Sequence, residues 1–328
     1  MEPENRAGGR DTFIYDSNHR DTLLGGLWIA EGTTNANLYC MVEIICNFTD
    51  TFDLRDNNEQ LVIRDEKPLQ PGNYFIVTNV RKQVLRPVAT TGFAMRDITP
   101  SAALSYHGHC SLQTGSITLT EEAPLFRGLS LESGARIVSF RDAVRERDRR
   151  CVITRVPVYE PAFSGWKMFE VAHIFPLAYE DHWNQSNYSR WITVPPANES
   201  DGFIHSVQNG MLLTRDLHAL FDGYDVSINP DDNYKIVCFA RETTWYNIAG
   251  RHLDQTFLDN PLRPADQLLR WHYRQAVLVN VKGLGEPCVE MDFPLGLDVM
   301  AEIMDDPKPV ERMEFELFSR FNAKRSRA

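Results

Sequence analysis

The chain has 328 residues, 43% of them hydrophobic, and a formal net charge of −11. This length suggests two or three domains with ample material for cores. The negative charge argues against a protein that coats nucleic acid non-specifically. No apolar run reaches the length of a membrane span, and the polar start Met1–Arg6 is not a secretory signal, so we expect no membrane partner. Six scattered cysteines show no disulfide pattern, which indicates an intracellular protein of the nucleus or cytoplasm.

Residues 1–125 are predicted to form a β-rich domain of unknown role. Its predicted strands are apolar or β-branched runs separated by turn-like segments: Leu38–Cys46, Asn73–Val80, Gln83–Val88 and Ser116–Thr120. His107, His109 and Cys110 have metal-binding side chains, but a loop with coincidental ligands is the preferred interpretation. The domain suits protein contacts or substrate choice.

An arginine-rich segment follows. Ser133–Arg150 is predicted to be a helix with one apolar face, running into a strand at Cys151–Thr154. From residue 136 to residue 155, seven arginines stand against three acidic residues, a local excess of four positive charges. We therefore expect Arg145, Arg149 and Arg150 to contact a nucleic-acid backbone. A solvated, salt-bridged helix face is an equally common alternative.

Two further segments carry histidines. Glu170–Pro176 is an apolar run short enough to be a buried strand, and it contains His173. Thr214 is the predicted N-cap of a short helix, in which His218 and Asp222 are four residues apart and project from one face. Taken singly, such residues are more often structural. His173 would then be a hydrogen-bonded core residue, and His218 with Asp222 would be an exposed pair that stabilises the helix by roughly 0.2–0.5 kcal/mol.

A strand histidine, an asparagine and a helix histidine in this order resemble the HNH endonucleases, which have the ββα-metal fold. The matching segments are Ala-His-Ile-Phe-Pro, Asn-Gly-Met-Leu-Leu and Asp-Leu-His-Ala-Leu-Phe-Asp, and they are similar to the branch common in fungal proteins of unassigned role. The resemblance implies that His173 is the general base, that Asn209 orients it, and that His218 helps hold a divalent cation, with Asp222 as a further ligand. We expect His173 and His218 to face one another across a strand–helix junction, with Asn209 near His173.

The resemblance also implies a metal-dependent hydrolase that cleaves phosphodiester bonds in DNA, with RNA left open, and that uses Mg²⁺ or Mn²⁺. A neutral imidazole can deprotonate water near neutral pH, and a cation stabilises charge on the leaving oxygen. An asparagine carbonyl that accepts the ring N–H would fix the histidine tautomer. A cation with few protein ligands keeps positions for phosphate oxygens and waters.

Two positions depart from the family pattern. Many members have an acidic residue or a second histidine directly before the base, where this chain has Ala172. Glu170 lies on the same strand face and is a partial substitute, and His182 is a spare candidate ligand. Cys151 has no Cys-x-x-Cys partner, so a structural zinc is not expected. Ala172 motivates a second hypothesis. In it, the chain is a catalytically weak or inactive, HNH-derived regulatory module that binds nucleic acid or protein.

The other segments are predicted to support this site. Aromatic residues in the loop between His173 and Asn209 either stack on bases or, as we prefer, pack on their own domain. The remaining predicted elements are a hairpin of Tyr224–Asn229 with Tyr234–Phe239, a helix at Pro264–Val279 and a last helix at Val310–Phe321. The C-terminal segments suit internal packing or a homodimer surface, and the sequence leaves both open.

These elements together predict an α+β protein. It would have a β-rich N-terminal domain over residues 1–125, a central ββα-metal HNH domain over residues 133–245, and a mainly helical C-terminal region over residues 246–328.

Overall fold

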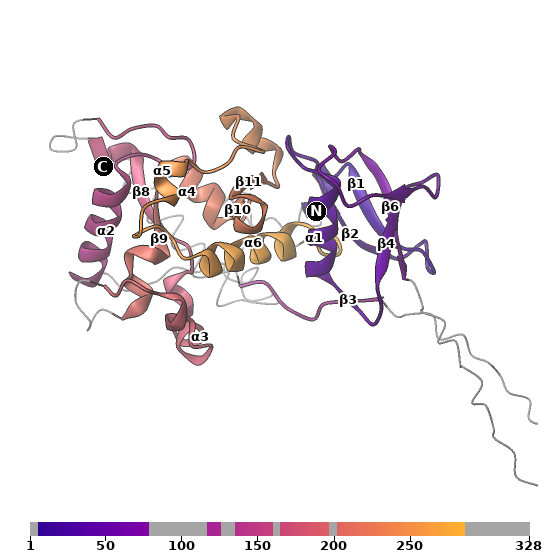
Figure 1. The fold of residues 1–328 in the computed structure, drawn as a ribbon, viewed down its shortest axis with the longest axis horizontal. Helices are drawn as coiled ribbons and strands as arrows, with labels where there is room; N and C mark the ends of the chain where they lie inside the picture. Colours follow the sequence, from indigo (N-terminus) through magenta and orange to yellow (C-terminus); the bar gives the residue numbers. More distant parts are fainter. Residues whose placement is uncertain (1–5, 79–116, 126–134, 160–164, 197–201, 286–328) are drawn as a thin grey trace, which may run out of the picture.

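The computed structural model describes residues 6–78, 117–125, 135–159, 165–196 and 202–285. They form a mixture of helices and several small sheets around two hydrophobic cores, one in the N-terminal part and one around the central segment (Figure 1). Within these ranges, no helix is long and apolar enough to cross a membrane.

A five-stranded sheet is the centre of the N-terminal part. In spatial order its strands are β2 (Leu23–Leu27), β1 (Thr12–Asp16), β6 (Gly72–Thr78), β4 (Phe52–Arg55) and β5 (Leu61–Val62). β1 and β6 pair in parallel, and the other neighbours are antiparallel. A separate two-stranded sheet joins β3 (Cys46–Phe48) and β7 (Ile117–Leu119). β6 and β7 correspond to two of the predicted strands.

Other predictions for this part lie outside the described residues: the strand at Gln83–Val88 and the possible ligands His107, His109 and Cys110. The predicted helix at Val310–Phe321 also lies outside them.

The predicted strand at Leu38–Cys46 is wrong, because most of this segment is helix α1, Asn35–Ile45. Thr34 caps the helix: its side chain accepts from the Asn37 N–H, and the Asn37 side chain accepts from the Thr34 N–H. The apolar side chains follow helical spacing and are buried: Leu38, Met41, Val42 and Ile45. An apolar run alone does not distinguish a buried helix from a strand, and here the cap decides.

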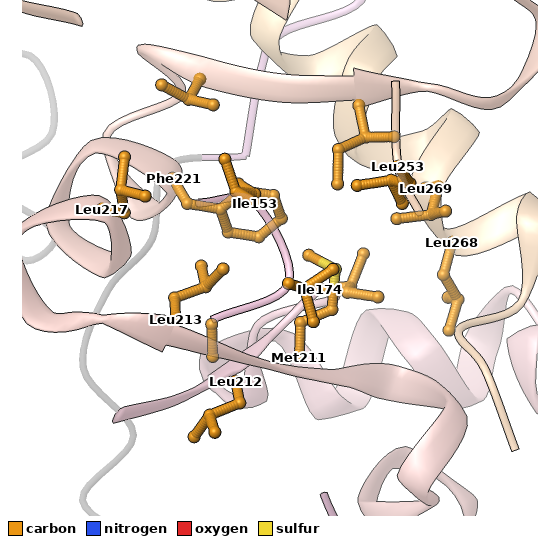
Figure 2. Packing of buried hydrophobic residues seen from close by; sticks show 14 of the residues in the cluster. Ile153, Ile174, Met211, Leu212, Leu213, Leu217, Phe221, Leu253, Leu268 and Leu269 are labelled. Atoms are coloured by element: carbon orange, nitrogen blue, oxygen red, sulfur yellow. The ribbon is translucent and has the colours of Figure 1, made fainter. Parts of the chain in front are cut away.

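The central segment begins with helix α2, Ala135–Asp148, within the predicted helix. Strands β8 (Phe169–His173) and β9 (Gly210–Thr214) pair antiparallel, with His173 opposite Gly210, and helix α4 (Arg215–Asp222) follows β9 directly. α4 packs on one face of this hairpin, and Figure 2 shows Leu213 between β9 and α4 with Leu212 on the other side of the strand.

Helix α2 covers that other face at very close range. A Cβ atom on Gly210 would lie only 2.5 Å from the ring of Phe140 and 2.9 Å from the side chain of Val144. Both are buried residues of α2. Glycine at this position therefore allows α2 to lie directly against the strand opposite His173.

The predicted strand at Cys151–Thr154 is also wrong. This segment is a turn in which the Arg155 N–H donates to the Cys151 carbonyl at 2.9 Å. The chain reverses between Arg149 and Arg155, whose φ angles of 50° and 64° do not fit a strand. The Val152 N–H still donates to a β9 carbonyl at 2.9 Å, so the β-branched residues pack in the core without forming a strand.

The loop after β8 contains helix α3, Glu180–Gln185, and packs on its own domain. Trp183 is buried, and the rings of Tyr188 and Trp191 stack with centroids 4.2 Å apart. Phe175 contacts both Trp183 and Tyr188 edge to face. These contacts agree with the packing interpretation of the loop aromatics.

The predicted hairpin and the predicted helix after it are present. Strands β10 (Val226–Asn229) and β11 (Lys235–Cys238) form the hairpin, and the short helix α5 (Gln255–Leu258) precedes helix α6 (Asp266–Asn280). α6 contributes residues to both hydrophobic cores, and in Figure 1 it runs from the central segment toward α1 and the N-terminal sheet. The backbone after α6 then bonds to the N-terminal sheet: the Gly26 N–H donates to Val281 and the Gly283 N–H to Leu24, each at 2.9 Å.

Candidate functional site

His218 lies between two carboxylates. Its Nδ1 is 2.9 Å from Oε2 of Glu170 on β8, and its Nε2 is 3.2 Å from Oδ2 of Asp222 one turn later on α4. Nε of Arg215, at the start of α4, is 3.3 Å from Oε1 of Glu170. The structure therefore brings together His218 and Asp222, as the four-residue spacing predicts, and adds Glu170 on the other ring nitrogen.

The two carboxylates stabilise the protonated form of His218. Burial disfavours the charged ring, but Asp222 and Glu170 outweigh it by charge and hydrogen bonding and raise the pKa of His218 to about 9. The hydrogen bond from His218 is the main reason why the pKa of Glu170 is lowered. At neutral pH the metal-free cluster is therefore a carboxylate–imidazolium–carboxylate group.

This cluster offers two donor atoms to a divalent cation. Nε2 of His218 and Oδ2 of Asp222 are 3.2 Å apart, and adjacent ligands of an octahedral ion with bonds of about 2.1 Å are ~3 Å apart. Glu170 would stay on Nδ1 and orient the ring, as carboxylates do for metal-bound histidines. In the ranges that the structure describes, no group of three or more His, Cys, Asp or Glu side chains is arranged to hold a metal. The donor pair suits a cation whose other positions are taken by water and phosphate oxygens.

The ring of His173 is directed to the other face of β8. It stacks on Phe140 of α2 with centroids 4.0 Å apart, and His205 meets it edge to face at 5.8 Å. Side chains alternate along a strand, so His173 and Glu170, three residues apart, point to opposite faces. We expected His173 and His218 to face one another, but in the structure they lie on opposite sides of the hairpin. His205 carries no sequence signal that sets it apart, so sequence reasoning missed it.

Asn209 is fully buried and close to the chain around His173. Its side chain donates to the carbonyls of Phe175 at 3.1 Å and Ile204 at 2.9 Å, and accepts from the Phe175 N–H at 2.8 Å. Its own carbonyl accepts from the Ile174 N–H at 2.9 Å. The bond expected from its side chain to the ring of His173 is not among these contacts. Asn209 instead fixes the backbone that follows His173.

The remaining ligand candidates lie elsewhere. Ala172 is fully buried opposite Met211 and has no donor atom. Nε2 of His182 is 3.4 Å from the hydroxyl of Tyr188, and its ring lies parallel to that of Phe175, so it belongs to the packed aromatic loop. Cys151 is a buried free cysteine.

Arg145 is the most distinctive of the predicted nucleic-acid contacts. Its guanidinium lies 4.6 Å from the ring centroid of Trp166, and its Nε is buried without a hydrogen-bond partner among the described residues. Burial, with the positive charge of Arg141 adding to it, lowers the pKa of Arg145. Within the described part of the chain, no carboxylate pairs with Arg145, and a cation on an indole ring keeps donors for an anion.

The other two predicted contacts are already paired. Arg149 is exposed and donates to both oxygens of Glu146, three residues earlier. Arg150 is 3.2 Å from Oδ1 of Asp254 and 3.0 Å from the hydroxyl of Thr256. A phosphate would have to compete with these partners.

Sequence reasoning gave no separate role to Arg147, which holds the segment around Asn209. The side chains of Arg147 and Asp148 are both 0% exposed and form an ion pair at 2.6 Å. Arg147 also donates to the carbonyls of Val207 at 2.8 Å and Gly210 at 2.7 Å, on either side of Asn209. This buried pair is a structural element and not a surface for nucleic acid.

β8, β9 and α4 form a ββα unit with one histidine on a strand and another on the helix. Residues 151–229 match the family model described as HNH endonuclease, and residues 9–83 match the model of a domain of unknown function, DUF8573. The central part of this chain is therefore an HNH endonuclease domain, as the sequence motifs indicate. No curated protein and no solved structure was found to match the chain.

Proposed function

We propose that this protein is a metal-dependent endonuclease that hydrolyses phosphodiester bonds in DNA. The observation that carries the proposal is the pair His218 and Asp222, with Glu170 on the opposite ring nitrogen, inside a segment that matches the HNH family. This arrangement provides a histidine ligand, a carboxylate ligand and a second carboxylate that orients the histidine. HNH domains generally use a divalent metal, and Mg²⁺ or Mn²⁺ suits a site with so few protein ligands.

Each residue of the site has a proposed role. When bound, the cation would polarise the scissile phosphate and stabilise charge on the leaving oxygen. Nε2 of His218 and the carboxylate of Asp222 would hold it, after His218 has lost its proton. Asn209 keeps the chain after β8 in place through its bonds to Phe175 and Ile204.

His173 is the proposed general base. It is partly exposed, as a base that takes a proton from water must be. Glu170 and His173 are about 10 Å apart along the strand and on opposite faces. A phosphodiester that reaches both the cation and His173 would have to cross the edge of β8. Arg145 on Trp166 is the proposed contact to the nucleic-acid backbone there.

The test is incubation of the purified full chain with supercoiled plasmid, single-stranded DNA and RNA in Mg²⁺, Mn²⁺ or EDTA. We expect cleavage of DNA that needs the metal and that is lost in His218→Ala. The matched control is His19→Ala, because His19 is exposed and lies in the N-terminal part. Cleavage that survives in EDTA or in His218→Ala contradicts the metal role.

Ala172 is the reason to consider a second outcome, binding of nucleic acid without cleavage. Ala172 leaves the site with one ligand fewer than many HNH domains have, so binding without cleavage in any metal would favour the regulatory, catalytically inactive module. Cleavage of RNA alone would retain the chemistry and change the substrate.

A further inference from the structure

The C-terminal end of α4, around Asp222, is held by side chains from outside the segment that matches the HNH family. Three backbone carbonyls accept these bonds: Phe221 from Nε2 of His272 at 3.1 Å, Gly223 from Nη2 of Arg6 at 2.9 Å, and Tyr224 from Nδ2 of Asn280 at 2.8 Å. The last carbonyls of a helix have no partner within the helix and need one elsewhere. Here α6 and the N-terminal segment provide the partners.

Arg6 makes two further side-chain contacts in this region. Besides Gly223, its guanidinium contacts Oδ1 of Asp225 at 2.5 Å and Oδ1 of Asn280 at 2.7 Å. Its side chain is only 17% exposed and that of Asp225 only 21%. Burial raises the pKa of Asp225, and the charge and hydrogen bonds of Arg6 oppose that rise. The rigid fork of the guanidinium thus joins the end of α4 to the end of α6.

We propose that Arg6 is a positioning residue for the metal site, through which the docked N-terminal part fixes Asp222 against His218. The inference rests on the proposed function, because it concerns the same donor pair. Arg6 holds the carbonyl of Gly223, the residue directly after Asp222, and so limits movement of the chain that follows Asp222. Nε2 of His218 and Oδ2 of Asp222 are 3.2 Å apart, so even a shift of about 1 Å would separate the pair.

Arg10 provides a matched comparison. It belongs to the same N-terminal segment, is buried, and donates to the carbonyls of Gly283 and Asn280, both at 2.5 Å. It therefore docks the N-terminal segment on the end of α6 and makes none of the contacts to α4 that Arg6 makes. A general effect of docking should appear in Arg10→Ala as well, whereas an effect on Asp222 should be specific to Arg6.

The experiment uses the full chain and two measurements at a temperature where circular dichroism shows each variant folded. The first is the NMR signal of the His218 ring in EDTA at a fixed neutral pH, which reports its contact with Asp222 without any metal. The second is the Kd for Mn²⁺ alone, measured by electron paramagnetic resonance of the free ion. We expect Arg6→Ala to shift the His218 signals and to raise the Kd about threefold or more, less than the roughly 10–100-fold typical of a lost direct orienting contact. Arg6→Lys should recover part of the loss, and Arg10→Ala should resemble the wild type in both measurements.

If Arg6→Ala lowers only the melting temperature, or if Arg10→Ala changes both measurements equally, Arg6 is an ordinary anchor and the inference is wrong. If the wild type binds no Mn²⁺, the proposed function loses its metal, while the His218 signals in EDTA still decide the role of Arg6. If Arg6→Ala does not fold, the same two measurements are made on Asp225→Asn. This substitution removes the charge that pairs with Arg6 and keeps the shape of the side chain.

Discussion

Nε2 of His218 and Oδ2 of Asp222 lie 3.2 Å apart on one face of α4, so a proton and the proposed metal ion would compete for the same ring nitrogen. Glu170 accepts from the other ring nitrogen, so it supports the ring in either state. Metal binding must release the proton on Nε2, because a histidine ligand is neutral. The charge of this cluster is thus the property to test first.

The stability of the metal-free protein should decrease between neutral and alkaline pH. The pKa of His218 is raised above its ordinary value of 6.5 to about 9. A raised pKa contributes stability that is fully present below the unfolded-state value and is lost as the pH rises through the folded-state value. Urea unfolding in EDTA from pH 6 to pH 10 should show this loss, and His218→Gln should remove that part of it. An unchanged pH profile in His218→Gln would show that the ring is not charged in the folded protein.

Removal of the carboxylate of Asp222 should weaken metal binding less than removal of His218. Asp222→Ala takes away one of two donors, whereas His218→Ala takes away a donor together with the group that Glu170 orients. Titration of DNA cleavage with Mn²⁺ should therefore show a higher half-saturating concentration for Asp222→Ala and a still higher one for His218→Ala. A curve for Asp222→Ala that coincides with the wild type would make Asp222 a helix-surface residue, and Glu170→Gln the next variant to measure.

His173 should affect both cleavage and packing. Its ring stacks on Phe140 at 4.0 Å, so His173→Ala should lose about 0.5–1.5 kcal/mol from aromatic packing in addition to cleavage. His173→Phe keeps a stacked ring without a base, so we expect near-normal stability and no cleavage. Cleavage by His173→Phe would exclude His173 as the base.

Local signals in the sequence predicted much of the fold. The predicted cap Thr214 located the start of α4, and the predicted hairpin and the predicted helix at Pro264–Val279 correspond to β10–β11 and α6. α1 was predicted as a strand, because a short apolar run fits either element.

Contacts between distant segments could not be predicted in this way. Alternation along the strand already separates His173 from Glu170, but only the structure shows that the face with His173 lies against α2 and the face with Glu170 against α4. Arg6 and Gly223 are 217 residues apart in the sequence, and no local pattern links them.

Arg145 should contribute more to nucleic-acid binding than Arg149. Arg145 lies on Trp166 and is not paired with a carboxylate in the described residues, whereas Arg149 already binds Glu146. Both substitutions to Gln remove one charge, so Arg149→Gln is the matched control. Fluorescence anisotropy of a labelled oligonucleotide in EDTA, repeated over a range of salt concentrations, separates the two. A lost phosphate contact lowers the slope of log K against log salt by about 0.7–0.9, and we expect this change for Arg145→Gln only. Equal slopes for the two variants would mean that Arg145 contacts no phosphate and that its role is to pack on Trp166.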